Sequence, residues 1–211
     1  VDRSGTTIYI TDTNNHAIRS MRGNLQFVER FAGLPRRAGK RDGPADKAKL
    51  DHPRRPELIG EALWFIDGDD RSRLRVVEQG VVRTLTWQGA RCPAFEAISA
   101  AEQAAERVYL LCQDSRVIEL DAAHASARVV VRPEPGARFV AIEVLPDGSF
   151  LLADAEGRIW SKHPELDSRV DPLVLVFANT SSEVLPVGGY PFAFDRVRMH
   201  HIVALEWIER Y

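Results

Sequence analysis

The stretch Ile8-Tyr9-Ile10-Thr11-Asp12 decides the fold, because a short apolar run that ends near an acidic residue recurs along the chain. The further copies are Leu63-Trp64-Phe65-Ile66-Asp67, Val108-Tyr109-Leu110-Leu111-Cys112, Phe150-Leu151-Leu152-Ala153-Asp154 and Ile202-Val203-Ala204-Leu205-Glu206. Successive copies start 55, 45, 42 and 52 residues apart. Periods of this size are typical of β-propeller blades built from four short strands.

Each period holds further β-like runs, separated by turn residues such as Gln79-Gly80 and Glu156-Gly157. A second run follows each copy, at His16–Met21, Arg73–Val77, Arg116–Leu120 and Arg158–Ser161, and a third at Leu25–Phe31, Val81–Trp87, Ala127–Val131 and Leu173–Phe177. A fourth precedes the next copy, at Pro56–Ile59, Phe95–Ser99, Phe139–Val144 and Tyr190–Phe194. The pattern predicts an all-β propeller of four-stranded antiparallel blades, with about five blades visible. A turn of helix is expected only within Ala97–Glu106, which is rich in Ala and Glu.

The recurring runs are apolar at nearly every position, whereas a half-exposed strand would alternate apolar and polar residues. Continuous hydrophobicity indicates burial on both faces, as for a strand between two neighbouring blades. We expect Tyr9, Trp64, Tyr109 and Trp160 to pack between blades, and Trp87 to be the aromatic residue most exposed to solvent.

Composition sets limits on the class of protein. The chain has 211 residues, is 45% hydrophobic and 27% charged, and carries a net charge of −2. These values exclude disorder over most of the length and a uniformly basic nucleic-acid binder. No apolar run approaches the roughly 20 residues of a membrane helix, so no membrane insertion is expected within this segment. The chain begins at Val1 without a leader, which suggests a piece of a longer protein.

The first repeat carries the most specific motif, Asp12-Thr13-Asn14-Asn15-His16-Ala17, followed by Phe31-Ala32-Gly33 and by Asp42-Gly43. It resembles the NHL repeat, whose motif residues here are Asp12, Asn15, His16, Gly33, Asp42 and Gly43. The resemblance implies a propeller, commonly of six blades. Residues 1–211 are then one NHL-like propeller domain that begins and ends in mid-blade, either a five-bladed ring or, as we favour, part of a six-bladed one.

The acids that end the runs, Asp12, Asp67, Asp154 and Glu206, allow two interpretations. They could form a ring of carboxylates that binds Ca²⁺. Alternatively, each caps the turn amides at the end of its own strand. We favour the structural interpretation, because Cys112 interrupts the series and a structural rule repeats in every blade.

The histidines give no zinc motif. His200 and His201 are adjacent in a predicted strand and point to opposite faces, and His16 belongs to the NHL-like motif. Resemblance to the amidating lyases of the propeller superfamily leaves open a site built from single histidines of different blades. We predict no cofactor, and Ca²⁺ or Zn²⁺ remain the metals that such a site would take.

The inter-blade segment Arg30–Arg55 is strongly basic, with nine basic and three acidic residues. Its candidate contacts to a partner or a polyanion are Arg36, Arg37, Lys40, Arg41, Lys47 and Lys49. Such a cluster could bind RNA phosphates, as some NHL propellers bind single-stranded RNA. The loop lacks interleaved aromatic residues for base stacking, and we favour a solvated loop between blades.

The two cysteines, Cys92 and Cys112, are either bridged or free and buried. A bridge would favour an oxidising compartment. Because standalone NHL propellers also occur as secreted or surface sensor domains, we expect a secreted or cell-surface protein rather than a cytoplasmic one.

The sequence therefore predicts a non-catalytic protein-binding scaffold or ligand-sensing propeller that presents inter-blade loops to a protein partner. One alternative is a metal-dependent propeller enzyme that resembles the lactonases or amidating lyases. A second is single-stranded RNA binding through the basic segment.

Overall fold

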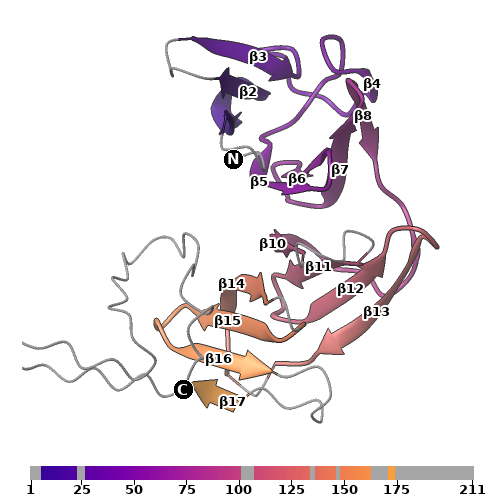
Figure 1. The fold of residues 1–211 in the computed structure, drawn as a ribbon. Coiled ribbons are helices and arrows are strands. Elements are labelled where there is room, and N and C mark those ends of the chain that lie inside the picture. Colours follow the sequence, from indigo (N-terminus) through magenta and orange to yellow (C-terminus); the bar gives the residue numbers. More distant parts are fainter. Residues whose placement is uncertain are drawn as a thin grey trace, which may run out of the picture.

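The computed structural model describes residues 6–22, 27–100, 107–133, 136–145, 148–162 and 171–173. Within these residues the chain forms four sheets of short strands and one short 3₁₀ turn, η1 (Thr13–Asn15). The four sheets follow one another in chain order around an arc (Figure 1). We call them blades A to D.

Blade A has the order β1-β2-β3, with β1 at Thr7–Asp12, β2 at Ala17–Arg22 and β3 at Val28–Ala32. Blade B has the order β5-β6-β7-β8-β4, with β4 at Gly43–Pro44, β5 at Arg54–Ile59, β6 at Ala62–Asp67, β7 at Arg73–Glu78 and β8 at Val81–Thr84.

Blade C has the order β10-β11-β12-β13-β9, with β9 at Gln88–Gly89, β10 at Phe95–Ser99, β11 at Arg107–Cys112, β12 at Val117–Asp121 and β13 at Ser126–Val131. Blade D has the order β14-β15-β16-β17, with β14 at Phe139–Val144, β15 at Phe150–Asp154, β16 at Ile159–Lys162 and β17 at Asp171–Leu173. Each blade is an antiparallel meander, extended by the two-residue strand β4 in blade B and by the parallel strand β9 in blade C.

The blades contact one another through their first strands, since β10 packs against both β5 and β14, and β1 against β5. This is the arrangement of a β-propeller, and it confirms the predicted fold class. The four described apolar runs are strands β1, β6, β11 and β15. The fifth run, at 202–206, lies outside the described residues. The helix predicted at Ala97–Glu106 is wrong for Ala97–Ser99, which belong to β10, and 101–106 lie outside the described residues.

In β6 and β11, alternate residues of the apolar run enter the cores on the two sides of the strand. Leu63 and Phe65 of β6 join the cluster between blades A and B, whereas Trp64 and Ile66 join the cluster between blades B and C. All six residues of β6 are buried. This double burial explains why the runs in β6 and β11 do not alternate apolar and polar residues, as a strand with one solvated face would. The expected burial on both faces is wrong for the first run, because Ile10 of β1 is 37% exposed.

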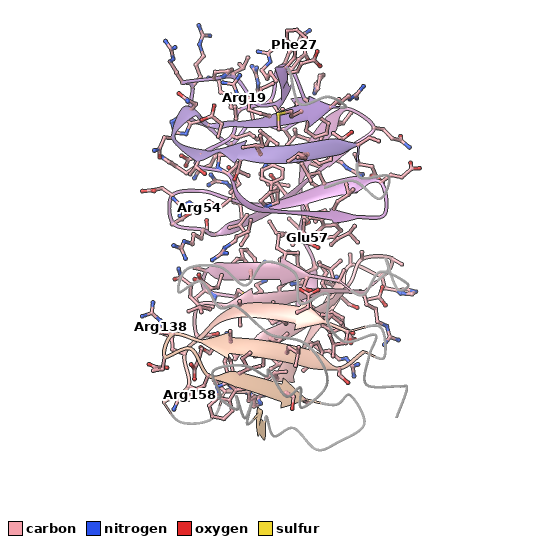
Figure 2. All side chains as sticks on the ribbon, turned by 60° about the vertical axis from the view of Figure 1, so that its left-hand side comes forward. Arg19, Phe27, Arg54, Glu57, Arg138 and Arg158 are labelled. Carbon is pink, nitrogen blue, oxygen red and sulfur yellow. A yellow bond between two sulfur atoms is a disulfide. The ribbon has the colours of Figure 1, made fainter. Side chains whose placement is uncertain are left out.

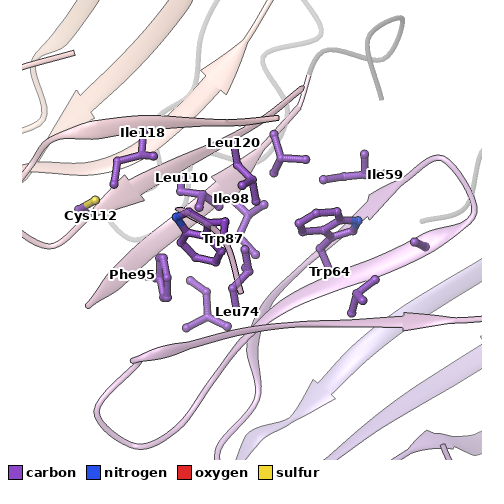
Figure 3. Packing of buried hydrophobic residues seen from close by; sticks show 14 residues of the cluster. Ile59, Trp64, Leu74, Trp87, Phe95, Ile98, Leu110, Cys112, Ile118 and Leu120 are labelled. Atoms are coloured by element: carbon purple, nitrogen blue, oxygen red, sulfur yellow. The ribbon is translucent and has the colours of Figure 1, made fainter. Parts of the chain in front are cut away.

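The cluster between blades B and C includes Trp64, Ile98 and Leu110 (Figure 3). Trp87 also belongs to it, with only 7% of its surface exposed, so the expected exposure of this residue is wrong. Its ring lies 6.1 Å from that of Phe95, and its Nε1–H donates to the carbonyl of Ala90 at 2.8 Å. The polar edge of the indole is thus satisfied while its apolar body fills the core.

Within the described part of the chain, we find no helix with the length and hydropathy needed to cross a membrane.

Candidate functional site

Two residues before the end of each apolar run, the strand pairs with an equivalent residue of the next strand. The pairs at this position are Ile10 with Arg19, Phe65 with Arg75, Leu110 with Ile118 and Leu152 with Trp160. In three blades the second residue donates to the strand-end acid, from Arg19 to Asp12, from Arg75 to Asp67 and from Trp160 to Asp154. In blade C the acid is replaced by Cys112, and the donor is replaced by Ile118. The acid and its donor are therefore present together or absent together.

Asp67 and Arg75 form a fully buried ion pair, with 2.8 Å between Arg75 Nη1 and Asp67 Oδ2. Arg75 also donates to the carbonyls of Lys49 and Arg41, at 2.8 and 3.1 Å, and to the carboxylate of Asp42 at 2.6 Å. The other oxygen of Asp67 accepts the backbone N–H of Asp51 at 2.7 Å. A single buried pair thus holds the segment that leads into β5 at two places, at Arg41 and Asp42 and at Lys49 and Asp51.

The segment from Gly33 to Pro53, which we call the basic loop, is folded on itself. The N–H of Gly33 donates to the carbonyl of Ala45, and the N–H of Gly39 donates to that of Leu50. Gly33 has a φ of +88°, and a Cβ there would lie 2.6 Å from the carbonyl oxygen of His16. The backbone requires glycine at this motif position.

Asp42, another motif residue, ties the basic loop to the outer strand of blade B. Its carboxylate accepts the backbone N–H of Thr84 at 2.9 Å as well as the guanidinium of Arg75. Burial alone would raise the pKa of Asp42, but these hydrogen bonds outweigh it and hold the pKa below its usual value.

The candidate basic side chains lie on this loop, and Arg36, Arg37, Lys40, Arg41 and Lys47 are exposed, while Lys49 is half-buried. Arg41 donates to the carbonyl of Lys47. Among the residues that the structure describes, Arg36, Arg37 and Lys40 have no carboxylate within ion-pair distance. The loop therefore presents cations to solvent from a backbone that is held in place.

Asp12 and Asp154 are each held by an arginine of their own blade, Arg19 at 2.9 Å and Arg158 at 2.6 Å. Burial would raise the pKa of Asp154, but hydrogen bonds from Trp160 and from the backbone and side chain of Arg158 lower it below its usual value. Within the described ranges, the strand-end acids do not gather into a group of metal ligands. Glu206 lies outside these ranges.

Another group of side chains meets where blades A and B join. His16, Asp51 and His52 each offer a ligand atom within 4.8 Å of the others. His52 Nδ1 lies 2.9 Å from Asp51 Oδ1, and the rings of His16 and His52 meet edge to face at 4.5 Å. Sequence reasoning placed His16 in a structural motif and His52 in a loop. It missed this cluster, because 36 residues separate the two histidines and no ligand spacing links them.

Two imidazoles and one carboxylate are donors that suit Zn²⁺ rather than Ca²⁺, which prefers oxygen ligands. The donors are partly used already. His16 Nδ1 accepts the backbone N–H of His52 at 3.2 Å, and Asp51 pairs with Arg73 at 3.3 Å. Burial would raise the pKa of Asp51, but the hydrogen bonds from His52 and Arg73 lower it. A metal ion here would replace the hydrogen bond to His16 or use its other ring nitrogen.

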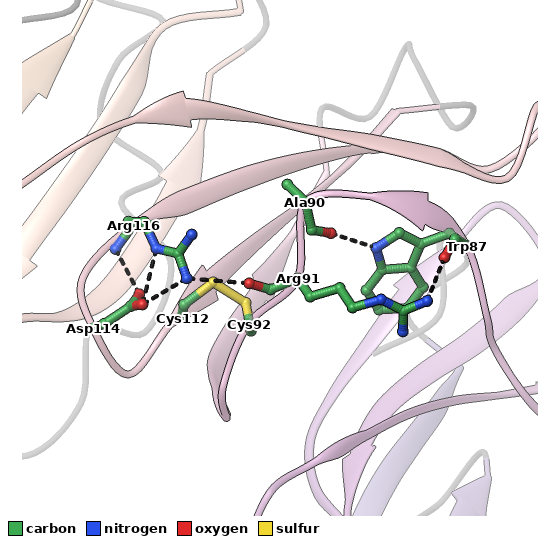
Figure 4. Close-up of a disulfide and its surroundings, with 7 residues drawn as sticks. All are labelled: Trp87, Ala90, Arg91, Cys92, Cys112, Asp114 and Arg116. Atoms are coloured by element: carbon green, nitrogen blue, oxygen red, sulfur yellow. Dashed lines mark hydrogen bonds and ion pairs between the residues drawn. A yellow bond between two sulfur atoms is a disulfide. The ribbon is translucent and has the colours of Figure 1, made fainter.

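In blade C a disulfide joins Cys92 to Cys112, with 5.1 Å between their Cα atoms (Figure 4). Arg116 spans the same corner, because it donates to the carbonyl of Arg91 at 3.1 Å and pairs with Asp114 at 2.7 Å. The bridge resolves the alternatives that the sequence left open for these cysteines.

Among the described residues, the histidine outside this cluster is His124. His124 is exposed, and its Nδ1 lies 2.8 Å from the carboxylate of Asp121. His163, His200 and His201 lie outside the residues that the structure describes.

The fold and these inter-blade contacts define a β-propeller, and comparison with solved structures agrees. The chain is similar to a gluconolactonase, XC5397 from Xanthomonas campestris, with a TM-score of 0.60, 13% identity and coverage of 82% of this chain and 59% of that one. It is also similar to virginiamycin B lyase from Staphylococcus aureus, with a TM-score of 0.55, 12% identity and coverage of 81% and 52%. A streptogramin B lyase gives a TM-score of 0.54 at 11% identity, with coverage of 82% and 53%.

These identities support a shared fold and nothing finer. The chain spans between 52% and 59% of the lengths of the three structures. No protein-family model matches the chain, and no curated protein matches its sequence. The similarity to NHL repeats therefore stays a resemblance of motifs.

Proposed function

We propose that this propeller is a non-catalytic binding module that presents its basic loop to an acidic surface of a partner protein. The observation that carries the proposal is the buried Asp67–Arg75 pair, which fixes the loop backbone while Arg36, Arg37 and Lys40 are exposed to solvent. A loop that is ordered before binding loses less conformational entropy on association. Clustered cations also steer an acidic partner toward the loop.

A protein partner fits the loop better than single-stranded RNA. Base stacking needs exposed aromatic faces beside the cations. The aromatic residue that flanks the loop is Phe31, which is half-buried and meets the ring of Tyr9 edge to face at 4.8 Å. RNA would therefore find phosphate contacts here without a stacking platform.

The test uses one variant in which Arg36, Arg37, Lys40 and Lys47 are changed to Ser. The matched control changes Arg22, Arg83, Arg128 and Arg132 to Ser, which removes the same charge from other exposed positions. Affinity for a fluorescent Asp/Glu-rich peptide and for oligouridine is measured by anisotropy at two salt concentrations. We expect the loop variant to bind the peptide at least about tenfold more weakly, and the control less than about twofold. Equal losses in both variants, or tighter binding of oligouridine than of peptide, would refute the proposal.

A second candidate is a metal-dependent propeller enzyme, which the cluster of His16, Asp51 and His52 favours. Zn²⁺ held by three protein ligands with an open position could activate a water molecule. The test is the zinc content per chain of tag-free protein, for the wild type, for His52→Ala and for the control His124→Ala. One equivalent that is lost only in His52→Ala supports this candidate, and zinc below about one tenth of an equivalent in the wild type removes it.

We also propose an oxidising location, secreted or at the cell surface, which the Cys92–Cys112 bridge supports. Alkylation of thiols in protein taken directly from its source tests this. Two alkylated cysteines per chain before reduction would contradict it.

A further inference from the structure

A small pocket lies between blades B and C, where β5 and β10 begin. It encloses about 160 Å³ and is lined by Arg54, Arg55, Ile66, Arg71 and Glu96. Figure 2 shows Arg54 on the same side of the stacked sheets as Arg138 and Arg158. The volume is below the roughly 300 Å³ at which pockets for drug-sized ligands begin, so it suits a small molecule or ion.

The lining is positively charged. The lining residues include three arginines and one acid, Glu96. Arg71 Nη1 donates to Glu96 Oε2 at 2.7 Å, and Arg55 Nη2 lies 3.6 Å from Glu96 Oε1. Arg54 reaches outward to Asp69, at 3.5 Å, but the side chain of Asp69 is 80% exposed. Exposed ion pairs contribute little to stability. The guanidinium groups of Arg54 and Arg55 can therefore still donate hydrogen bonds to another anion.

The backbone is irregular at the arginines that line this pocket. Consecutive residues of a regular strand point to opposite faces. Arg54 and Arg55 nevertheless line the same pocket, because the pairing of β5 with β6 shifts register between Arg54 and Glu57. Arg55 has a φ of +51°, and Arg71 has a φ of +55°. Bulges that re-aim side chains, and non-glycine residues in the left-handed region, are concentrated at binding and catalytic sites.

We propose that this pocket binds a small oxyanion, namely the carboxylate or phosphate group of a small molecule. The planar guanidinium offers paired N–H donors that match either group. Glu96 holds Arg71 and Arg55 in position and competes with the ligand for them. The pocket begins where the basic loop ends, at Arg54, but it uses none of Arg36, Arg37 and Lys40, so it does not depend on the function proposed above.

The test titrates the folded protein with inorganic phosphate and, separately, with succinate, at low and constant ionic strength, and follows binding by calorimetry. We expect at least one of these anions to saturate a single site. Arg55→Gln and Arg71→Gln should each weaken binding at least about fivefold. Glu96→Gln removes the competing carboxylate and should strengthen binding at least about threefold. Arg132→Gln, on an exposed arginine outside the pocket, is the control.

Near-UV circular dichroism checks that each variant is folded. Because Arg71→Gln should weaken anion binding and Glu96→Gln should strengthen it, either variant tests the proposal if the other folds poorly. Tighter binding of phosphate assigns the site to phosphate groups, and tighter binding of succinate assigns it to carboxylates. Failure of both anions to saturate, weaker binding by folded Glu96→Gln, or an equal loss in Arg132→Gln would overturn the proposal.

Discussion

Blades B and C secure the chain that enters them at equivalent places but with different chemistry. In blade B, Asp67 at the end of the apolar run accepts the backbone N–H of Asp51, three residues before β5 begins. In blade C, Cys112 at the same place bonds covalently to Cys92, three residues before β10 begins. In both blades, the last residue of the apolar run holds the chain that enters the blade. Its residue type can differ where the residues that contact it differ too.

The partners change in the same way. The register position that holds Arg75 in blade B holds Ile118 in blade C. A buried arginine without a carboxylate would be very costly, so loss of the acid requires loss of the cation. Ile118 instead joins the apolar cluster between blades B and C.

The largest expected effect comes from breaking the pair in blade B. Arg75→Leu removes the guanidinium that donates to Asp67, which leaves this buried carboxylate with the longer ion pair to Arg73, at 3.5 Å. It also frees the basic loop from its hydrogen bonds at Lys49 and Arg41. We expect a loss of about 3–5 kcal/mol in the free energy of unfolding, measured in urea. A loss below about 1 kcal/mol would show that the loop is held by other contacts.

Removal of the covalent link in blade C should cost somewhat less. The bridge spans a sequence separation of 20 residues. For Cys92→Ala with Cys112→Ala we expect a loss of about 3 kcal/mol in denaturant unfolding. Reductant should lower the wild type toward the stability of the variant. A wild type that reductant leaves unchanged, while free thiols appear, would contradict the structural role of the bridge.

Glu57 in β5 provides a comparison with the strand-end acids, which accept hydrogen bonds from neighbouring side chains. Burial, together with the carboxylate of Glu143, raises the pKa of Glu57 to about 7. Its carboxyl group therefore costs no stability below the unfolded pKa, and stability is lost as the pH rises toward 7. We expect Glu57→Gln to stabilise the protein by about 2 kcal/mol near pH 8 and to have little effect near pH 4, by thermal unfolding.

Asp154→Asn is the control for Glu57→Gln, because its effect on stability should have the opposite sign. The pKa of Asp154 is lowered, so its stabilisation is present at neutral pH and lost as the pH falls through the folded-state pKa. We expect a loss of about 1 kcal/mol near pH 7 and a smaller one near pH 3. The same pH dependence for the Glu57 and Asp154 variants would refute this assignment.

The smallest effect belongs to an exposed ion pair in the same sheet as Asp67 and Arg75. Arg83 pairs with Glu78, and the two side chains are 57% and 43% exposed. Arg83→Ala should change the free energy of unfolding by less than about 1 kcal/mol. A loss as large as that of Arg75→Leu would remove the distinction between buried and exposed pairs.

The sequence predicts the strands well because apolar runs leave a strong local signal, which burial on two faces explains for β6 and β11. The runs that start at Ile8, Leu63, Val108 and Phe150 all lie in strands. The exposure predicted for Trp87 is wrong, because its burial depends on contacts with Phe95 and Ala90 across the corner of the blade. Such contacts leave no periodic pattern in the sequence.

The site was harder to predict than the fold. His16 and His52 come together only when blades A and B pack, and Arg54 and Arg55 share a pocket only because of a register shift. Neither the packing of the two blades nor the register shift produces a recognisable residue spacing in the sequence. The role of Arg75 follows from its register with Phe65, which requires the paired strands to be known.

A double-mutant cycle on Asp67 and Arg75 tests the central claim most directly. The free energy of unfolding is measured for the wild type, Asp67→Asn, Arg75→Met and the double variant. If the two residues hold the basic loop as one unit, the coupling energy should be at least about 2 kcal/mol. Losses that add to within about 0.5 kcal/mol would show that the residues act independently and would contradict the account.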